Sequence, residues 1–346
     1  MDSVVRQTLQ AVATGKTLSD QAAESFMNLL MEGHISAIQT AGLLAAMSVR
    51  GESVDEIVGF ARAMKSHSVP IHVPFATVDS CGTGGDGGQT FNISTASAFV
   101  AAAAGARVAK HGNRAISSRS GSADVLQALG ANIDLDETQT VQCLEHCGIA
   151  FLFAPYYHPA MKHAAQTRKE LGFRTIFNIL GPLTNPLSPR GQVIGVFNAN
   201  LVPKVAAALE QLDVEHALVV HGDGGIDEFS ITGATLVAEL HNGSIRQYHV
   251  RPQQFGLSPA AMESIAGGSS ETNAHLIRDV FAGQKGGARD VVLLNAGAVL
   301  YVGGLAPSLE EGVHVAATAI DEGLAAATLD DFVATTCRLG RTEIAQ

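Results

Sequence analysis

The sequence has no apolar stretch that approaches the roughly 20 uninterrupted residues of a membrane-spanning helix. Residues 1–20 also lack the basic stretch and apolar core of a secretory signal, so we expect a cytoplasmic protein with no membrane partner. Cysteine is scarce, with 4 among 346 residues, which argues against a disulfide scaffold. Cys143 and Cys147 would share one face of a helix, where packing is the expected role because no second cysteine or histidine pair stands at metal-binding spacing.

Positive charge is scarce as well. Lysine and arginine number 22 against 33 acidic residues, which gives a net charge of −11. Nucleic-acid binding depends on basic surface, so we expect no nucleic-acid partner. The apolar fraction of 46% and the charged fraction of 16% are typical of a well-packed globular protein. A polyanionic ligand would therefore need a locally positive site inside an acidic protein.

The first 70 residues read as a series of helices. Three residue pairs have the spacing of a capping box: Thr17 with Asp20, Ser36 with Gln39, and Ser53 with Glu56. Gly33 and Gly51 stand where helices that begin near residues 18 and 37 should end. Pro70 and Pro74 then break the helical pattern, and we expect a hinge at 70–75.

From about residue 75 strand and helix signals alternate. The apolar runs 106–109, 217–220 and 291–294 predict strands buried on both faces, and the segments 97–104, 123–129 and 203–212 predict helices between them. This alternation predicts an α/β fold with a mainly parallel central sheet covered by helices. In such sheets ligands lie beyond the carboxyl ends of the strands, which is where the glycine-rich loops fall.

A glycine-rich segment from Asp79 to Thr95 is the first candidate site. Its glycines let backbone N–H groups approach a ligand without side chains in the way: Gly82, Gly84, Gly85, Gly87 and Gly88. Thr90, Asn92 and Ser94 follow and lead into an alanine-rich helix, whose first N–H groups favour anions. A flexible turn with a helix cap is the alternative. The spacing matches neither the Walker A loop nor the dinucleotide fingerprint.

A basic loop at 110–122 directly follows a predicted strand. Lys110, Arg114 and Arg119 supply the positive charge that the overall composition lacks. Serine hydroxyls in the same loop add hydrogen-bond donors, and Asp124 is expected to begin the next helix. A solvated basic loop is the alternative reading, but the position at a strand end favours an anion site.

Two adjacent carboxylates, Asp227 and Glu228, follow another apolar run on a glycine-rich loop. Magnesium in proteins prefers one or two carboxylates, several waters and phosphate oxygens from the substrate. An acidic pair opposite a phosphate-binding loop would meet that need. Neighbouring acids are also common on protein surfaces, so the pair is significant only together with the other loops.

Aromatic and proline residues gather at 153–159 and 172–186 and could form the wall of a flat ligand site. Arg168 lies between these segments and could bind a carboxylate through two parallel hydrogen bonds. Taken singly, Tyr156, Tyr157 and His158 are better explained as packing or surface residues.

Together these segments resemble the anthranilate phosphoribosyltransferase family of tryptophan biosynthesis, over essentially the whole chain. The motifs Gly-Thr-Gly-Gly-Asp86, Thr-Phe-Asn-Ile-Ser-Thr95, Lys-His-Gly-Asn113 and Asp227-Glu228 stand in the family's order and spacing. The resemblance implies a helical domain at 1–72, with an insertion from about 158–190, beside an α/β domain at 73–346. It also implies a homodimer joined through the helical domains.

The resemblance implies a reaction of small-molecule substrates: transfer of phosphoribose from phosphoribosyl diphosphate to the amine of anthranilate. For the diphosphate substrate it points to Gly82, Gly85, Asp86, Thr90, Asn92, Ile93, Ser94, Thr95, Lys110, Asn113, Arg114, Ser117, Ser118 and Ser122. For anthranilate it points to Gly82, His111, Asn113 and Arg168. For magnesium, as two ions, it points to Ser94, Asp227 and Glu228. Gly224 departs from the pattern, because an acidic residue is common there in the family.

The aromatic amine of anthranilate is neutral near pH 7, so the reaction needs no strong base. We expect catalysis by stabilisation of the leaving diphosphate, with no covalent enzyme intermediate and no residue acting as nucleophile or acid–base catalyst. A pyrimidine-nucleoside phosphorylase, which would use inorganic phosphate without magnesium, is the nearest alternative. A non-catalytic nucleic-acid-binding relative is the second, and it would be expected to lack the acidic pair.

Overall fold

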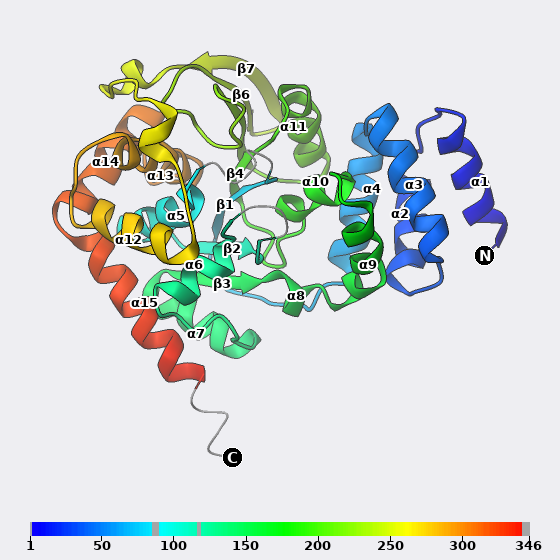
Figure 1. Cartoon of the computed structure of the whole chain (residues 1–346), viewed down its shortest axis with the longest axis horizontal. Helices are drawn as coiled ribbons and strands as arrows, with labels where there is room; N and C mark the ends of the chain where they lie inside the picture. Colours follow the sequence, from blue (N-terminus) through cyan, green and yellow to red (C-terminus); the bar gives the residue numbers. More distant parts are fainter. Residues whose placement is uncertain (1, 85–89, 116–118, 341–346) are drawn as a thin grey trace.

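The computed structural model describes residues 2–84, 90–115 and 119–340. Its N-terminal part consists of four helices: α1 (Asp2–Ala13), α2 (Asp20–Met31), α3 (Ala37–Arg50) and α4 (Val54–Ser66). Two helices from the middle of the chain, α9 (Lys162–Leu171) and α10 (Ile176–Leu183), pack against α3 and α4. Figure 1 shows this helical part, in blue and green, beside the larger α/β part.

The helix starts follow the predicted capping boxes in two of three cases. Ser36 and Ser53 each accept a hydrogen bond from a backbone N–H of the first turn, and the side chains of Gln39 and Glu56 accept one from the cap backbone in return. The Thr17 prediction is wrong. Ser19 caps α2 instead, and its side chain accepts from the backbone N–H three residues on, which leaves Thr17 outside the helix.

The α/β part contains one seven-stranded sheet in the order β3-β2-β1-β4-β5-β6-β7. The strands are β1 (Val78–Gly82), β2 (Val108–Gly112), β3 (Ile149–Phe153), β4 (Gly191–Gly195), β5 (His216–Gly222), β6 (Thr235–His241) and β7 (Ser244–Val250). Strands β1 to β5 pair in parallel, and β6 and β7 are antiparallel. The prediction of a mainly parallel sheet is therefore confirmed. The chain adds strands on one side of β1 and then crosses to β4 on its other side, which makes the β1–β4 boundary a topological switch point.

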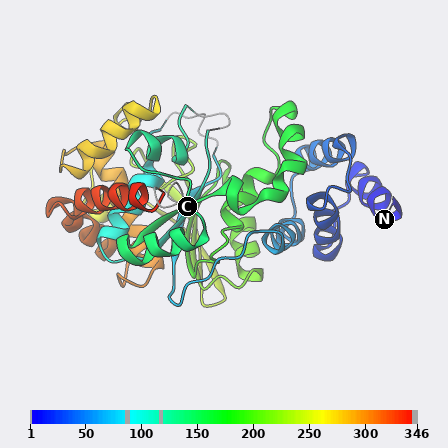
Figure 2. The same cartoon turned by 90° about the horizontal axis from the view of Figure 1, so that it is seen from below.

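The helices of the α/β part cover both faces of this sheet (Figures 1 and 2). They are α5 (Ile93–Ala103), α6 (Ser122–Ala128), α7 (Glu137–Cys147), α8 (Ala154–Tyr157), α11 (Val202–Gln211), α12 (Ser270–Phe281), α13 (Gly287–Val302), α14 (Leu309–Asp321) and α15 (Leu324–Gly340). Short 3₁₀ turns lie at Pro159–Met161, Ala199–Leu201, Pro252–Phe255 and Met262–Ile265. None of the described helices has both the length and the apolar character needed to cross a membrane.

Two of the strand predictions need correction. The run 106–109 only overlaps β2, which begins at Val108. The run 291–294 is not a strand but part of α13. This helix is buried on nearly all sides between α5 and α14, so its sequence shows no polar face and an apolar run there cannot be told from a buried strand.

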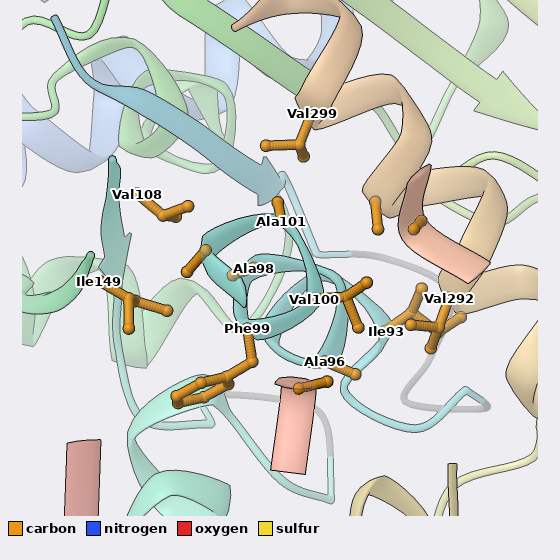
Figure 3. Close-up of a cluster of buried hydrophobic side chains, with 14 of the residues drawn as sticks. Ile93, Ala96, Ala98, Phe99, Val100, Ala101, Val108, Ile149, Val292 and Val299 are labelled. Carbon is orange, nitrogen blue, oxygen red and sulfur yellow. The ribbon is translucent and has the colours of Figure 1, made fainter. Parts of the chain in front are cut away.

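Helix α5 lies at the centre of the main apolar core. Packing in this core holds the first turn of α5 near the carboxyl ends of the parallel strands. Figure 3 shows Ile93, Phe99 and Val100 of α5 among Val108, Ile149 and Val292 from the sheet and α13. The Phe99 ring packs edge-on against Phe281 and Phe332. Small alanines elsewhere on α5 allow the close approach to α13.

Candidate active site

The acidic pair lies against the glycine-rich loop at the switch point of the sheet. Gly82 and Gly195 end the neighbouring strands β1 and β4, and Asp227 lies directly on both. A Cβ atom on either glycine would overlap Asp227, so only glycine permits this contact. The backbone N–H of Gly84 donates to Asp227 Oδ2 at 2.7 Å. Two segments that are 143 residues apart in sequence therefore form one site.

Asp227 and Glu228 are largely buried in the loop between β5 and β6. Together with burial and Asp79, their negative charges raise the pKa of the nearby Cys81 thiol to about 12. Near neutral pH the Cys81 thiol therefore stays protonated, which makes it a poor nucleophile. The oxygen atoms at this position are those that magnesium prefers over softer ligands.

Lys110 supplies positive charge beneath the glycine-rich loop. It is fully buried on β2, and its Nζ donates to the Ser80 carbonyl oxygen at 2.8 Å and to Ser94 Oγ at 3.2 Å. Ser94 lies in the first turn of α5, whose N-cap residue, Asn92, makes no side-chain capping hydrogen bond. The helix start thus presents N–H groups and a buried cation together, which suits an anion.

The start of α5 is held in place by polar contacts from two other segments. Asn92 donates to the Ser120 carbonyl oxygen at 3.1 Å and accepts from the Asn273 amide at 2.9 Å. Thr90 pairs with Ala266 in a short β-bridge. Thr95 Oγ1 and Ser80 Oγ are buried and have no hydrogen-bond partner among the described residues. Unpaired buried hydroxyls beside an anion site are available to a ligand.

The basic loop after β2 is folded back on the start of α6. Arg114 pairs with Asp124 at 3.1 Å and stacks on the Phe153 ring at 5.6 Å, so its guanidinium is already partly engaged. Helix α6 begins at Ser122 rather than at the predicted Asp124. The carbonyl of Asn113 accepts from the backbone N–H of Ala123, which keeps this residue next to the sheet edge.

Four of the predicted site residues lie outside the described residues. They are Gly85, Asp86, Ser117 and Ser118. Gly224, the departure from the family pattern, has a φ of 84° and lies beside Met262, whose side chain a Cβ atom would overlap. The backbone conformation at this point therefore favours glycine over an acidic residue.

Two histidines lie together in this part of the structure: His111 near the end of β2, and His158 directly after α8. His111 Nδ1 bonds the Gly181 carbonyl oxygen at 3.1 Å, and the His111 and His158 ring centroids are 5.1 Å apart. Burial lowers the pKa of His111 to about 3 and that of His158 to about 4. Both Nε2 atoms are buried without a hydrogen-bond partner among the described residues. The sequence predicts a packing or surface role for His158, and only its position shortly after a predicted strand could have indicated this site.

Arg168, in the last turn of α9, faces α10. Its guanidinium lies over the Phe177 ring at 5.0 Å, and burial lowers the pKa of Arg168. None of the ion pairs among the described residues involves it. Since Gly181 of the same α10 bonds His111, one helix holds both of these predicted anthranilate contacts.

A buried carboxylate beneath the site was not assigned from the sequence. Asp79 in β1 accepts from the Asn185 amide at 2.8 Å and from the His111 backbone N–H at 3.4 Å. Burial raises the pKa of Asp79 to about 6, although the Lys110 charge opposes the shift. Asn185 comes from the loop after α10, so Asp79 connects that loop to the two residues, Lys110 and His111, that reach the site.

Known proteins share this architecture. Residues 75–326 match the family model "Glycosyl transferase family, a/b domain", and residues 6–68 match the "helical bundle domain" of the same family. The anthranilate phosphoribosyltransferase of Rubrobacter xylanophilus is 52% identical over 337 residues, which cover 97% of this chain and 98% of that protein. The enzyme of the same name from Brevibacillus brevis is 52% identical over 91% of this chain and 93% of its own length.

Solved structures of anthranilate phosphoribosyltransferases have the same fold. The anthranilate phosphoribosyltransferase of Thermus thermophilus matches with a TM-score of 0.90 and 44% identity, over 95% of this chain and 99% of that one. The Saccharomyces cerevisiae enzyme, in complex with PRPP and Mg, matches with a TM-score of 0.88 and 25% identity, over 98% and 99%. On the strength of the sheet, the site and these relatives, the chain belongs to the anthranilate phosphoribosyltransferases of the glycosyl transferase family.

Proposed function

We propose that this chain transfers the 5-phosphoribosyl group from phosphoribosyl diphosphate to the amine of anthranilate. The products are N-(5-phosphoribosyl)anthranilate and diphosphate, in tryptophan biosynthesis. The contact between Asp227 and the Gly84 backbone N–H carries the proposal, because it places a pair of carboxylates on a phosphate-type loop above a buried lysine. A chain built only to bind an anion would have no use for carboxylates at that point.

Phosphoribosyl diphosphate would bind along the ends of β1 and β2 and the start of α5. The groups that would hold it are the backbone around Gly82, the hydroxyls of Thr90, Ser94, Thr95 and Ser122, the polar Asn92–Ile93 start of α5, and the side chains of Lys110, Asn113 and Arg114. Gly85, Asp86, Ser117 and Ser118 would complete the site. The buried Lys110 ammonium explains how an acidic protein accepts a polyanion.

Magnesium fits the oxygen donors of Ser94, Asp227 and Glu228, and we propose that they hold it as two ions. When bound, magnesium would neutralise the charge that grows on the departing diphosphate. Lys110 would add to this stabilisation from below, since its Nζ already contacts Ser94. The backbone N–H groups at the start of α5 would provide the rest.

Anthranilate would lie between the sheet edge and α10. Arg168 would pair with its carboxylate, and Gly82, His111 and Asn113 would line the side that faces the sugar. The partial desolvation of Arg168 strengthens its pairing with an anion. In the reaction, the amine nitrogen bonds to C1 of the ribose as the C1–oxygen bond to diphosphate breaks, with oxocarbenium character at C1, and the nitrogen then releases one proton to solvent. Holding the two substrates in contact supplies much of the rate.

The direct test follows anthranilate fluorescence in the presence of phosphoribosyl diphosphate, with and without magnesium. The proposal expects fluorescence to fall only when all three are present. A pyrimidine-nucleoside phosphorylase would instead cleave nucleosides with inorganic phosphate and no magnesium. A glycosylated enzyme trapped by rapid quench would contradict the direct displacement proposed for the reaction.

We also propose that the chain works as two domains, 1–72 with the 158–190 insertion and 73–346, which close about a hinge at 70–75. The separate family matches at 6–68 and 75–326 support this division. Closure would bring Arg168 of the insertion toward the ends of β1 and β2. Small-angle scattering with both substrates bound should show compaction, and an unchanged radius of gyration would contradict closure.

A homodimer through the helical domain is proposed from the surface of α3. Ile38 and Val49 are 85% and 91% exposed, and Gly42 and Ala45 lie between them on the same face at helical spacing. Ile38→Glu with Val49→Glu should yield a monomer in size-exclusion chromatography with light scattering. A dimer that survives both changes would exclude this face. The described cysteines are all free, in keeping with a reducing cytoplasm as the proposed location.

A further inference from the structure

Three side chains with metal-ligating atoms meet at the other end of the strands, where β5 begins and β6 ends. His216 begins β5, and Glu239 and His241 lie near the end of β6. The antiparallel register places His216 directly opposite His241, and the two-residue period puts all three side chains on one face. One ligand atom from each side chain lies within 4.8 Å of the others.

Among these three side chains, Glu239 is the one held by the largest number of hydrogen bonds. It is 1% exposed, and its Oε2 accepts from Arg246 at 2.9 Å and from the Tyr248 hydroxyl at 2.7 Å. The Tyr301 hydroxyl donates to Oε1 at 2.8 Å. The carboxylate is therefore oriented by three neighbouring side chains and largely closed to water.

The two imidazoles complete a donor set that is open on one side. His216 Nε2 lies 3.3 Å from Glu239 Oε1, and the His216 ring stacks on the His241 ring at 4.2 Å. His216 is buried, and Tyr301 packs edge-on against it. His241 is exposed, so its ring can tilt out of the stack and a solvent ion can reach the cluster.

We propose that His216, Glu239 and His241 bind a divalent transition-metal ion of the zinc class. Two imidazoles and one carboxylate form a donor set that zinc uses in proteins, with water in the fourth position, whereas magnesium prefers oxygen donors alone. The ion would lie between His216 Nε2 and Glu239 Oε1, in place of the hydrogen bond that joins them. Glu239 Oε2 stays with Arg246 and Tyr248, and these partners orient the carboxylate as outer-shell groups do at known metal sites.

The site is structural rather than catalytic. His216 and Gly222 stand at opposite ends of β5, so at about 3.3 Å per residue the ion would lie roughly 20 Å from the substrate edge. It would join β5 to β6 and, through Tyr301, to α13. A ligand that binds only the folded state stabilises that state by mass action, so the ion should raise the thermal stability of the chain.

The test uses the intact, chelator-treated enzyme without substrates, titrated with zinc by calorimetry. We expect one zinc site per chain, at least tenfold weaker binding in His241→Ala and in His216→Ala, and no competition from millimolar magnesium. His249→Ala is the matched control, because His249 is exposed on the neighbouring β7 but faces the other side of the sheet. This control should bind zinc as the unmodified enzyme does.

His241 is exposed, so His241→Ala should fold normally and keep its transferase activity. Zinc should raise the melting temperature of the unmodified enzyme and of His249→Ala but not that of His241→Ala. The proposal is overturned if His241→Ala binds zinc within twofold of the unmodified enzyme, if all variants show only the same weak binding, or if magnesium displaces the zinc.

Discussion

Two buried carboxylates on the same sheet have opposite environments. Asp79 in β1 and Glu239 in β6 are each 1% exposed. Asp79 has one amide donor and a longer backbone contact, and burial raises its pKa to about 6. Hydrogen bonds from His216, two tyrosines and an arginine overcome the burial of Glu239 and lower its pKa to about 2. Burial acts to raise both pKa values, and the additional hydrogen bonds at Glu239 reverse that shift.

The same contrast holds for the polar groups around each carboxylate. Near Asp79 the described structure leaves Ser80 Oγ, Thr95 Oγ1 and the Nε2 atoms of His111 and His158 buried without partners. None of the described side chains around Glu239 has such an unpaired atom. Unpaired polar groups reduce stability but are available to a ligand, so the surroundings of Asp79 are suited to ligand binding and those of Glu239 to rigidity.

The largest expected effect comes from Lys110→Met, which keeps the volume of the side chain but removes its charge. We expect kcat/KM for phosphoribosyl diphosphate to fall by about 10³, as when a main transition-state contact is lost. Steady-state kinetics on the purified variant measure it. Lys285→Met, which removes an exposed partner of Asp321, is the control and should stay near the unmodified rate. A fall below tenfold in Lys110→Met would place the diphosphate elsewhere.

Neutral replacements of the two carboxylates should differ in their cost to stability. Glu239→Gln leaves Arg246 and two tyrosine hydroxyls without a charged acceptor, and we expect a loss of about 3 kcal/mol in the free energy of unfolding at pH 7. Asp79→Asn removes a charge that burial already disfavours, so the loss should be about 1 kcal/mol or less. Urea denaturation gives both values. Equal losses of unfolding free energy in the two variants would contradict the proposed difference between the two carboxylates.

Arg168→Ala tests the proposed anthranilate contact. Loss of a charge-assisted pair should raise the anthranilate KM by roughly 10- to 100-fold, with a much smaller effect on the KM of phosphoribosyl diphosphate. Arg174→Ala is a matched control, since Arg174 also stacks on an aromatic ring, that of Phe197. If Arg168→Ala weakens both substrates equally, Arg168 has a structural role instead.

Two buried histidines, His111 and His158, should make the folded protein less stable as the pH falls. The folded pKa values of His111 and His158, about 3 and about 4, lie below the ordinary value of 6.5. Below pH 6.5 the unfolded chain therefore binds protons that the folded chain does not, and stability falls as pH falls. Asp79, with its raised pKa, acts in the opposite direction between pH 6 and 3.8.

Two histidines outweigh one aspartate, so the free energy of unfolding should fall by about 1 to 2 kcal/mol between pH 6.5 and 5. Denaturation at a series of pH values measures this slope. His158→Gln removes one of the two groups and should flatten the slope. A slope that is unchanged in His158→Gln would mean that other groups control acid stability.

Local signals account for what the sequence could predict. The capping boxes at Ser36 and Ser53 depend on residues only three positions apart, and they appear as predicted. Two kinds of feature could not be predicted from the sequence. The apolar run at 291–294 belongs to a helix that is buried on nearly all sides, so its sequence lacks the alternation of apolar and polar residues that identifies a helix. Asp79 with Asn185 depends on a contact between segments 106 residues apart, which no local pattern encodes.

The central claim is that Asp227 and Glu228 hold the magnesium that serves the leaving diphosphate at the β1–β4 switch point. The most direct measurement compares the magnesium dependence of anthranilate consumption in two variants: the double variant Asp227→Ala/Glu228→Ala, and Asp223→Asn, which changes the same loop. We predict that the rate of the double variant no longer depends on magnesium and that its kcat falls by about 10²–10³, while Asp223→Asn keeps the magnesium dependence and the kcat of the unmodified enzyme. A double variant that remains active and still responds to magnesium would contradict the account.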